Sequence, residues 1–196
     1  MISDRANSPT RVVTIGDESV GKTSLTARLV NNRFNQYEPS TVGANYQEYS
    51  VFVKDSSISI QIWDTAGQEK FKSLSPIYYR NASAAVVVFS LTSRRTFEKL
   101  NDWINSFMEV AGNGAIVYIA ANKSDLTSEF EVTIEETREW AKSCGYKYFV
   151  TSAKTGEGVC DMFTELANDI LSTKESKRQA VNPRPIQPNN ESDQCC

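Results

Sequence analysis

Hydrophobic and polar residues alternate in two neighbouring stretches of the chain. The hydrophobic positions of these stretches are Tyr49, Val51 and Val53, followed by Ile58, Ile60 and Ile62. Residues 54–57, with the sequence Lys-Asp-Ser-Ser, separate the stretches and are typical of a turn. The alternation therefore predicts a β-hairpin with one buried face.

Three other stretches have no such alternation. Residues 11–15 form a short β-rich run, and residues 84–89 and 116–120 are almost continuously apolar. Nearly continuous apolar runs are expected of strands that are covered on both faces. These stretches therefore predict central strands of a sheet.

Apolar residues recur at helical spacing between and after these runs. One helical stripe consists of Phe97, Leu100, Ile104, Phe107 and Met108, and another of Val159, Phe163, Leu166 and Ile170. The segment 133–136, Thr-Ile-Glu-Glu, is typical of a capping box that begins a helix, which Gly145 would end. The alternation of strands and helices predicts a three-layer α/β domain with a mostly parallel sheet.

Composition and the ends of the chain indicate one domain with a tail. With 196 residues, 40% hydrophobic and 23% charged, the chain has the composition of a globular protein. We assign residues 1–9 to a flexible leader, 10–173 to the domain, and the proline-bearing segment 174–196 to a disordered tail. The start of the chain has no signal-peptide pattern, and its apolar runs are shorter than the ~20 residues of a membrane span. We therefore expect a soluble, intracellular domain.

Charge and residue usage exclude several classes of protein. The net charge of −3 argues against a protein that binds nucleic acid over its whole surface. The chain has no histidine, which excludes Ser-His-Asp hydrolysis, Cys-His proteolysis and histidine-built zinc sites. Cys144 and Cys160 lie in apolar-patterned segments, so we expect them to be buried free thiols.

A phosphate-binding motif occupies residues 16–23. The sequence Gly-Asp-Glu-Ser-Val-Gly-Lys-Thr matches G-x-x-x-x-G-K-[ST] and lies between a predicted strand and a predicted helix. Glycines at these positions let successive backbone N–H groups face an anion, while Lys22 reaches phosphates and the Thr23 hydroxyl ligates Mg²⁺. The motif predicts a phosphate-binding loop but does not select a base.

Three further polar segments follow predicted strands, where open α/β sheets bind ligands. In residues 63–69, Asp64 can hold Mg²⁺ through water and the Gly67 N–H can meet a γ-phosphate. In residues 122–125, Asn-Lys-Ser-Asp, a carboxylate can accept from guanine N1–H and the 2-amino group, donors that adenine lacks. Residues 152–154, Ser-Ala-Lys, are the third segment. Taken alone, each of the first two segments is more often a polar turn than a ligand site, and the third is a weak signal.

Together and in this order, the segments resemble the Ras superfamily of small GTPases over about residues 10–173, and within it the Rab family. The supporting segments are residues 40–44, 60–63, 70–74 and 77–82, and the chain ends in paired cysteines. Some of these segments are most similar to the early-endosomal branch of the Rabs. The resemblance implies a P-loop G domain with a six-stranded, mostly parallel sheet, one antiparallel edge strand and helices on both faces.

The resemblance also implies a role for individual residues. Gln68 would orient the attacking water, with Lys22 as the second catalytic group; Phe34 and Lys123 would cover the two sides of guanine. The complete set of implied nucleotide contacts is Glu18, Ser19, Val20, Gly21, Lys22, Thr23, Ser24, Phe34, Thr41, Gly67, Asn122, Lys123, Asp125, Ser152, Ala153 and Lys154. The implied Mg²⁺ site is Thr23 and Thr41, with Asp64 acting through water. The implied effector-facing residues are Tyr46, Trp63 and Tyr78, and the implied lipidation sites are Cys195 and Cys196.

The function that this resemblance implies is a GTP/GDP switch that hydrolyses GTP and regulates vesicle trafficking. Its expected partners are guanine nucleotide, an exchange factor, a GTPase-activating protein, a GDP-dissociation inhibitor, the prenylation machinery and effectors, with no nucleic acid. We expect a monomer on the cytoplasmic face of an intracellular membrane, endosomal by the branch, that cycles with the cytosol. Attachment would be through the lipidated tail.

Glu18 departs from the family pattern, in which glycine, serine or glutamine is common at this position. A carboxylate near the γ-phosphate would crowd the hydrolytic site and slow hydrolysis, unless it turns to solvent. One alternative is therefore a GTP-binding scaffold with negligible hydrolysis. A second alternative, a phosphotransferase acting on a small molecule, shares only the phosphate loop and is opposed by residues 122–125.

Overall fold

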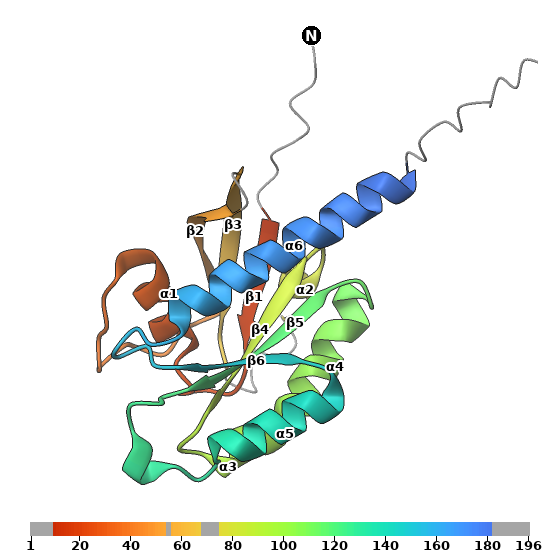
Figure 1. Ribbon diagram of the computed structural model, residues 1–196. Helices are drawn as coiled ribbons and strands as arrows, with labels where there is room; N and C mark the ends of the chain where they lie inside the picture. Colours follow the sequence, from red (N-terminus) through yellow and green to blue (C-terminus); the bar gives the residue numbers. More distant parts are fainter. Residues whose placement is uncertain (1–9, 54–55, 68–74, 182–196) are drawn as a thin grey trace, which may run out of the picture.

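The computed structural model describes residues 10–53, 56–67 and 75–181, and places a six-stranded sheet at the centre of the molecule (Figure 1). The strands are β1 (Thr10–Ile15), β2 (Ala44–Val53), β3 (Ser56–Thr65), β4 (Ala84–Ser90), β5 (Ile116–Asn122) and β6 (Lys147–Thr151). Their order is β2-β3-β1-β4-β5-β6, and only the edge pair β2–β3 is antiparallel among the described strands. The predicted sheet is confirmed.

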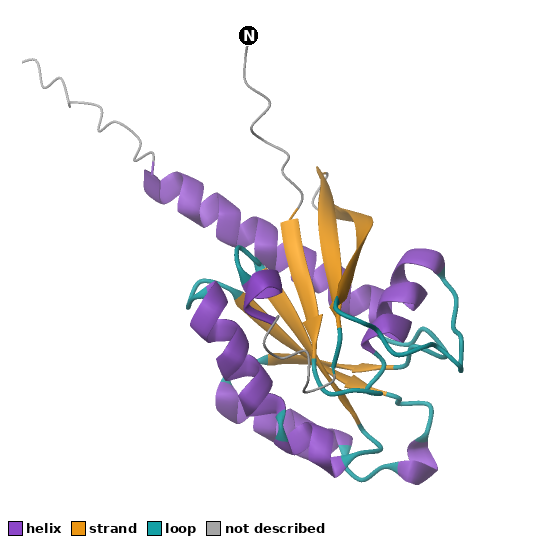
Figure 2. Ribbon diagram, turned by 180° about the vertical axis from the view of Figure 1, so that it is seen from behind, coloured by secondary structure: helices purple, strands orange, loops and turns teal. Residues whose placement is uncertain are grey.

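Helices cover both faces of the sheet (Figures 1 and 2). They are α1 (Lys22–Asn31), α2 (Ser75–Tyr79), α3 (Arg94–Glu98), α4 (Leu100–Ala111), the 3₁₀ turn η2 (Thr127–Glu129), α5 (Ile134–Cys144) and α6 (Val159–Val181). The α1 and α6 helices pack on one face, and α2, α3, α4 and α5 contribute to the core on the other. The three predicted layers are therefore present.

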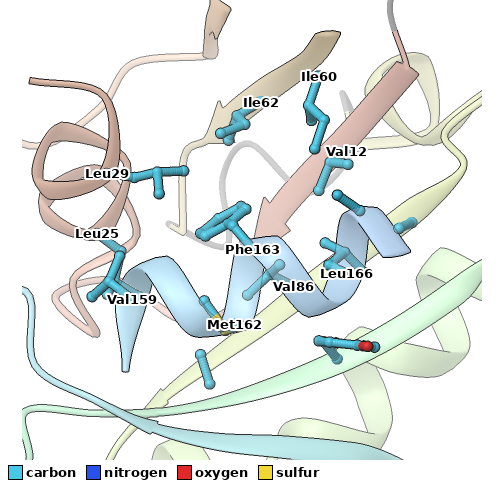
Figure 3. Close-up of a cluster of buried hydrophobic side chains, with 14 of the residues drawn as sticks. Val12, Leu25, Leu29, Ile60, Ile62, Val86, Val159, Met162, Phe163 and Leu166 are labelled. Atoms are coloured by element: carbon cyan, nitrogen blue, oxygen red, sulfur yellow. The ribbon is translucent and has the colours of Figure 1, made fainter. Parts of the chain in front are cut away.

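Alternate residues of the central strands contribute their side chains to the two hydrophobic cores, one on each face of the sheet. On β4, Val86 and Val88 face α1 and α6, whereas Val87 and Phe89 face the opposite helices, and all seven residues of the strand are buried. Burial of both faces explains why the run is apolar without alternation. Figure 3 shows the first core, in which Phe163 of α6 lies among side chains of the sheet and of α1.

The helical stripe predicted over residues 97–108 belongs to two helices. Lys99, with φ −85° and ψ 0°, ends α3 and begins α4. Phe97 and Leu100 still contribute to the same core, so the hydrophobic spacing conceals the break.

The predicted burial of Cys144 and Cys160 is wrong, because both thiols are exposed. Val159 and Phe163 carry the buried face of α6, and Cys160 is about 100° around the helix from Val159. Cys144 is the last residue of α5. Proximity in sequence to apolar residues therefore does not fix the face of a helix on which a cysteine lies.

Helix α6 is longer than the pattern of apolar residues predicts. It continues to Val181, so the boundary placed between residues 173 and 174 falls inside it, and the Lys174 side chain donates to the Thr10 hydroxyl. None of the helices in the described ranges has the length and apolar character that crossing a membrane requires. Cys195 and Cys196 lie outside the described residues.

Candidate functional site

A pocket of about 420 Å³ lies where the carboxyl ends of the parallel strands meet. Its walls come from the phosphate loop after β1, the segment after β3, and the loops after β5 and β6. Residues 34–41, which connect α1 to β2, complete it. The sheet topology thus brings together all four segments that the sequence singled out.

The phosphate loop has the geometry of an anion cradle. Gly21 immediately precedes α1 with φ +98°, a conformation that favours glycine. Lys22 is 5% exposed, and its ammonium donates to the carbonyls of Gly16 and Asp17 at 2.9 and 2.7 Å. A Cβ on Gly67 would collide with the Lys22 Nζ and the Asp17 carbonyl, so this wall of the cradle requires glycine.

Burial lowers the pKa of Lys22 to about 8. The negative charges of Asp64, Asp17 and Glu18 act in the opposite direction and raise this pKa, but burial has the larger effect. The charged form is therefore penalised by desolvation, and a bound anion would relieve that penalty. Glu18 itself is exposed and lines the pocket. A buried ammonium at the N-terminus of a helix is chemically suited to phosphate.

Three side-chain oxygens converge next to Lys22. Thr23 Oγ1 lies 2.7 Å from Thr41 Oγ1 and donates to Asp64 Oδ2 at 2.6 Å, and Thr41 Oγ1 donates to the same carboxylate oxygen at 3.4 Å. Burial raises the pKa of Asp64, opposed by hydrogen bonds from both threonines and by the charge of Lys22. Hydroxyl and carboxylate oxygens are the donors that Mg²⁺ prefers, so this set fits that cation.

The described residues contain no cluster of three or more His, Cys, Asp or Glu side chains that could hold a metal ion without further ligands. A cation beside Thr23 would take part of its coordination from phosphate oxygens and water, as Mg²⁺ commonly does.

Asn122 connects the two halves of the pocket. Its side chain is 1% exposed; Nδ2 donates to the Val20 carbonyl at 2.8 Å, and Oδ1 accepts from the Ala153 N–H at 3.3 Å. The amide thus joins the phosphate loop to residues 152–154.

Asp125 presents a carboxylate to the pocket. Oδ1 accepts a 2.6 Å hydrogen bond from Ser152 Oγ, and the Lys154 ammonium lies 3.9 Å from Oδ2. Lys123, whose backbone has φ +70°, lines the same wall, and burial lowers its pKa. Phe34, 38% exposed, lines the pocket from the segment that connects α1 to β2.

Most of the nucleotide contacts expected from the sequence line this pocket. Val20 and Ser152 do not: both are fully buried, and each makes a hydrogen bond to a residue that does. Gln68 lies outside the described residues. The lining residues that the sequence did not reveal are Asn35, Gln36, Glu38, Pro39, Ser40, Thr65 and Leu126.

Three aromatic rings form a cluster on β2, β3 and α2. The rings of Tyr46 and Trp63 stack with centroids 5.3 Å apart, and Tyr78 follows at 6.0 Å from Trp63. The guanidinium of Arg11 lies 4.5 Å over the Trp63 ring, and Tyr46 remains 50% exposed. The three rings therefore lie in mutual contact, with Tyr46 half-exposed and Trp63 half-buried.

Comparison with known proteins identifies this architecture. The family model described as "Ras family" matches residues 11–172. The Ras-related protein Rab5A of Oryza sativa subsp. japonica is 34% identical over 190 residues, covering 95% of this chain and 94% of that protein. Human Ras-related protein Rab-21 is 35% identical over 178 residues, covering 91% and 79%, and RABF2b of Arabidopsis thaliana is 37% identical over 160 residues, covering 82% and 80%.

The chain therefore belongs to the Ras family, whose members are guanine-nucleotide-binding GTP hydrolases. More narrowly, it is a Rab-type small GTPase of the early-endosomal branch, and it acts in vesicle trafficking. Both predictions from the sequence are confirmed. The relatives give no support to the alternative of a scaffold that barely hydrolyses GTP.

Proposed function

We propose that the chain is a molecular switch that binds GTP and GDP in the 420 Å³ pocket and hydrolyses GTP to GDP and phosphate. The convergence of Thr23, Thr41 and Asp64 beside Lys22 is the observation that carries this proposal. Thr41 belongs to a loop rather than to a helix or strand, so a ligand that holds this hydroxyl also holds the loop. Nucleotide state is thereby coupled to surface shape.

The phosphate end of the nucleotide is assigned to Lys22 and the backbone N–H groups of the phosphate loop and Gly67. Thr23 and Thr41 would ligate Mg²⁺, with Asp64 acting through water. The cation would supply charge neutralisation of the phosphates. The protein contributes positioning and electrostatic stabilisation, since phosphoryl transfer to water needs no covalent intermediate with the chain.

Asp125 is the proposed determinant of the base. Its carboxylate is held by Ser152 and points into the pocket wall that Lys123 and Ala153 share. A carboxylate accepts from guanine N1–H and the 2-amino group, neither of which adenine has. Phe34 and Lys123 would lie on the two sides of the ring, and the Ala153 N–H would meet guanine O6.

The loop that carries Thr41 and the segment that carries Gly67 lead directly to the aromatic cluster of Tyr46, Trp63 and Tyr78. We propose that this cluster binds effectors in the GTP state. Large, partly exposed aromatic side chains are suited to a binding hot spot. Gln68, outside the described residues, is the proposed water-orienting residue.

The remaining parts of the proposal concern the tail and the regulators. Cys195 and Cys196 would carry two isoprenoid chains, because a single chain gives only marginal membrane binding. The protein would be monomeric and would cycle between cytosol and an endosomal membrane with the help of an exchange factor, a GTPase-activating protein and a GDP-dissociation inhibitor. Replacing both cysteines by serine should leave nucleotide binding intact and abolish membrane attachment in cells.

The test of the nucleotide site uses purified full-length protein with Mg²⁺ and an Asp125→Asn variant. We expect the native chain to retain GDP or GTP at micromolar concentration and to prefer them to adenine nucleotides. Asp125→Asn should lose guanine affinity and gain xanthine affinity, because xanthine presents a carbonyl where guanine has the amino group. Undiminished GTP affinity in that variant would overturn the assignment of the base site.

A further inference from the structure

Arg28, in the last turn of α1, reaches from that helix to the loop that would contact the base. Its Nε donates to the Ala153 carbonyl at 2.8 Å, and its Nη2 donates to the Lys154 carbonyl at 2.7 Å. One planar guanidinium therefore holds two successive carbonyls. A lysine at this position would present a single point charge and could not bind both in this way.

The same guanidinium is fixed from its other side. Nη1 donates to the carbonyl and to the side-chain oxygen of Asn32, both at 3.0 Å. Asn32 has φ +48° and ends α1 with a backbone hydrogen bond to Arg28. Since all these acceptors fix its plane, the guanidinium has a defined orientation toward residues 153–154.

Helix α1 thereby connects both ends of the pocket. Its first residue is Lys22, at the phosphate end, and Arg28 contacts the base loop less than two turns later. An α-helix of this length is rigid, with a rise of about 1.5 Å per residue. The spacing between the phosphate cradle and the Ala153 N–H is consequently set by α1 through Arg28, in parallel with the Asn122 link to Val20.

We propose that Arg28 is a positioning residue for base recognition: its two hydrogen bonds to the carbonyls of residues 153 and 154 hold the Ala153 N–H where it meets guanine O6. Arg28 does not line the pocket and would not touch the nucleotide. This inference rests on the proposed guanine site. Adenine carries an amino group in place of O6, so the position of this N–H contributes to discrimination between the two bases.

The experiment measures the dissociation rate of a fluorescent GDP analogue, competition by GDP and ADP, and the melting temperature of the full-length protein with Mg²⁺. The variants are Arg28→Gln and Arg28→Lys. Arg95→Gln is the matched control, because Arg95 is an exposed arginine on α3, outside the pocket. Arg28→Lys retains the charge and much of the aliphatic stem, so it serves as the second test if Arg28→Gln does not fold.

We expect Arg28→Gln to release GDP about tenfold faster and to lose about tenfold of its preference for GDP over ADP, since it removes two charge-assisted hydrogen bonds. Arg28→Lys should recover only part of the preference, and Arg95→Gln should match the native protein. A lower melting temperature with an unchanged preference and release rate would overturn the inference and leave Arg28 a structural residue. If the native protein itself does not retain GDP, the proposed function fails instead.

Discussion

Lys22 shows how a single buried charge shapes the site. Its side chain is 5% exposed, and desolvation lowers its pKa to about 8 in spite of three neighbouring carboxylates. Glu18 is the weakest of these three influences and is itself exposed. Its carboxylate nevertheless lines the pocket within electrostatic reach of the lysine that would bind phosphate.

Substitution of Glu18 tests whether this carboxylate obstructs hydrolysis. We expect Glu18→Gly to hydrolyse GTP several-fold faster in a single-turnover assay, because the variant loses both the charge and the bulk beside the γ-phosphate. Glu18→Gln keeps the bulk and removes the charge, so its rate separates the two effects. Equal rates for all three proteins would mean that the side chain stays in solvent throughout the reaction.

Ser152 provides a second prediction at the level of one residue. It is fully buried, donates to Asp125 at 2.6 Å and accepts from the Thr155 N–H at 3.0 Å. We expect Ser152→Ala to release GDP roughly tenfold faster, because the Asp125 carboxylate loses the donor that orients it. Ser143→Ala, on the exposed end of α5, is the control in the same stopped-flow assay. Identical release rates for the two variants would refute the positioning role.

Among the secondary-structure elements, α4 and the residue that precedes it contact the phosphate loop. The Trp103 indole N–H donates to Asp17 Oδ1 at 3.1 Å, and the Lys99 ammonium lies 3.2 Å from Asp17 Oδ2. Asp17 is almost completely buried. A residue of the loop between β1 and α1 is thus held by the helical layer on one face of the sheet.

Replacing Trp103 measures the strength of this attachment. We expect Trp103→Phe to lower the free energy of unfolding by about 1–3 kcal/mol, because it leaves a buried carboxylate with one donor fewer. Trp140→Phe is the control, since Trp140 packs against the rings of Phe97 and Tyr146. Urea denaturation followed by circular dichroism compares them. An equal or greater loss at Trp140 would show that ring volume, not the hydrogen bond, accounts for the effect.

For the molecule as a whole, the sequence predicted those parts of the fold in which hydrophobic residues recur at the spacing of a strand or a helix. The doubly covered strands, the hairpin, and the position of the glycine-lysine motif between β1 and α1 were all correct, because burial and backbone geometry restrict which residues can occupy these positions. The break between α3 and α4 at Lys99 could not be predicted from the hydrophobic spacing, because the apolar residues of both helices face the same core. The pocket-lining residues between positions 35 and 40 show no regular hydrophobic spacing either. They belong to a pocket only because the fold brings their segment next to loops that are distant in sequence.

Because the pocket is assembled from loops that belong to α1 and to four strands, nucleotide binding should stabilise the whole domain. A ligand at 1,000 times its dissociation constant adds about 4 kcal/mol, which corresponds to roughly 8–16 °C in melting temperature for a chain of this size. We expect GDP with Mg²⁺ to produce a shift of this order and EDTA to reverse much of it, as measured by differential scanning calorimetry.

The threonine hydroxyl beside Asp64 separates the contribution of the cation from that of the nucleotide. Thr23→Ala should lose most of the Mg²⁺-dependent part of the stabilisation, whereas Thr23→Ser, which keeps the hydroxyl, should retain it. The reason is that Thr23 Oγ1 lies 2.6 Å from Asp64 and 2.7 Å from Thr41, at the centre of the oxygen cluster. If Thr23→Ala kept the full response to Mg²⁺, the cation would have to bind elsewhere, and the proposed link between nucleotide state and the loop of Thr41 would fail with it.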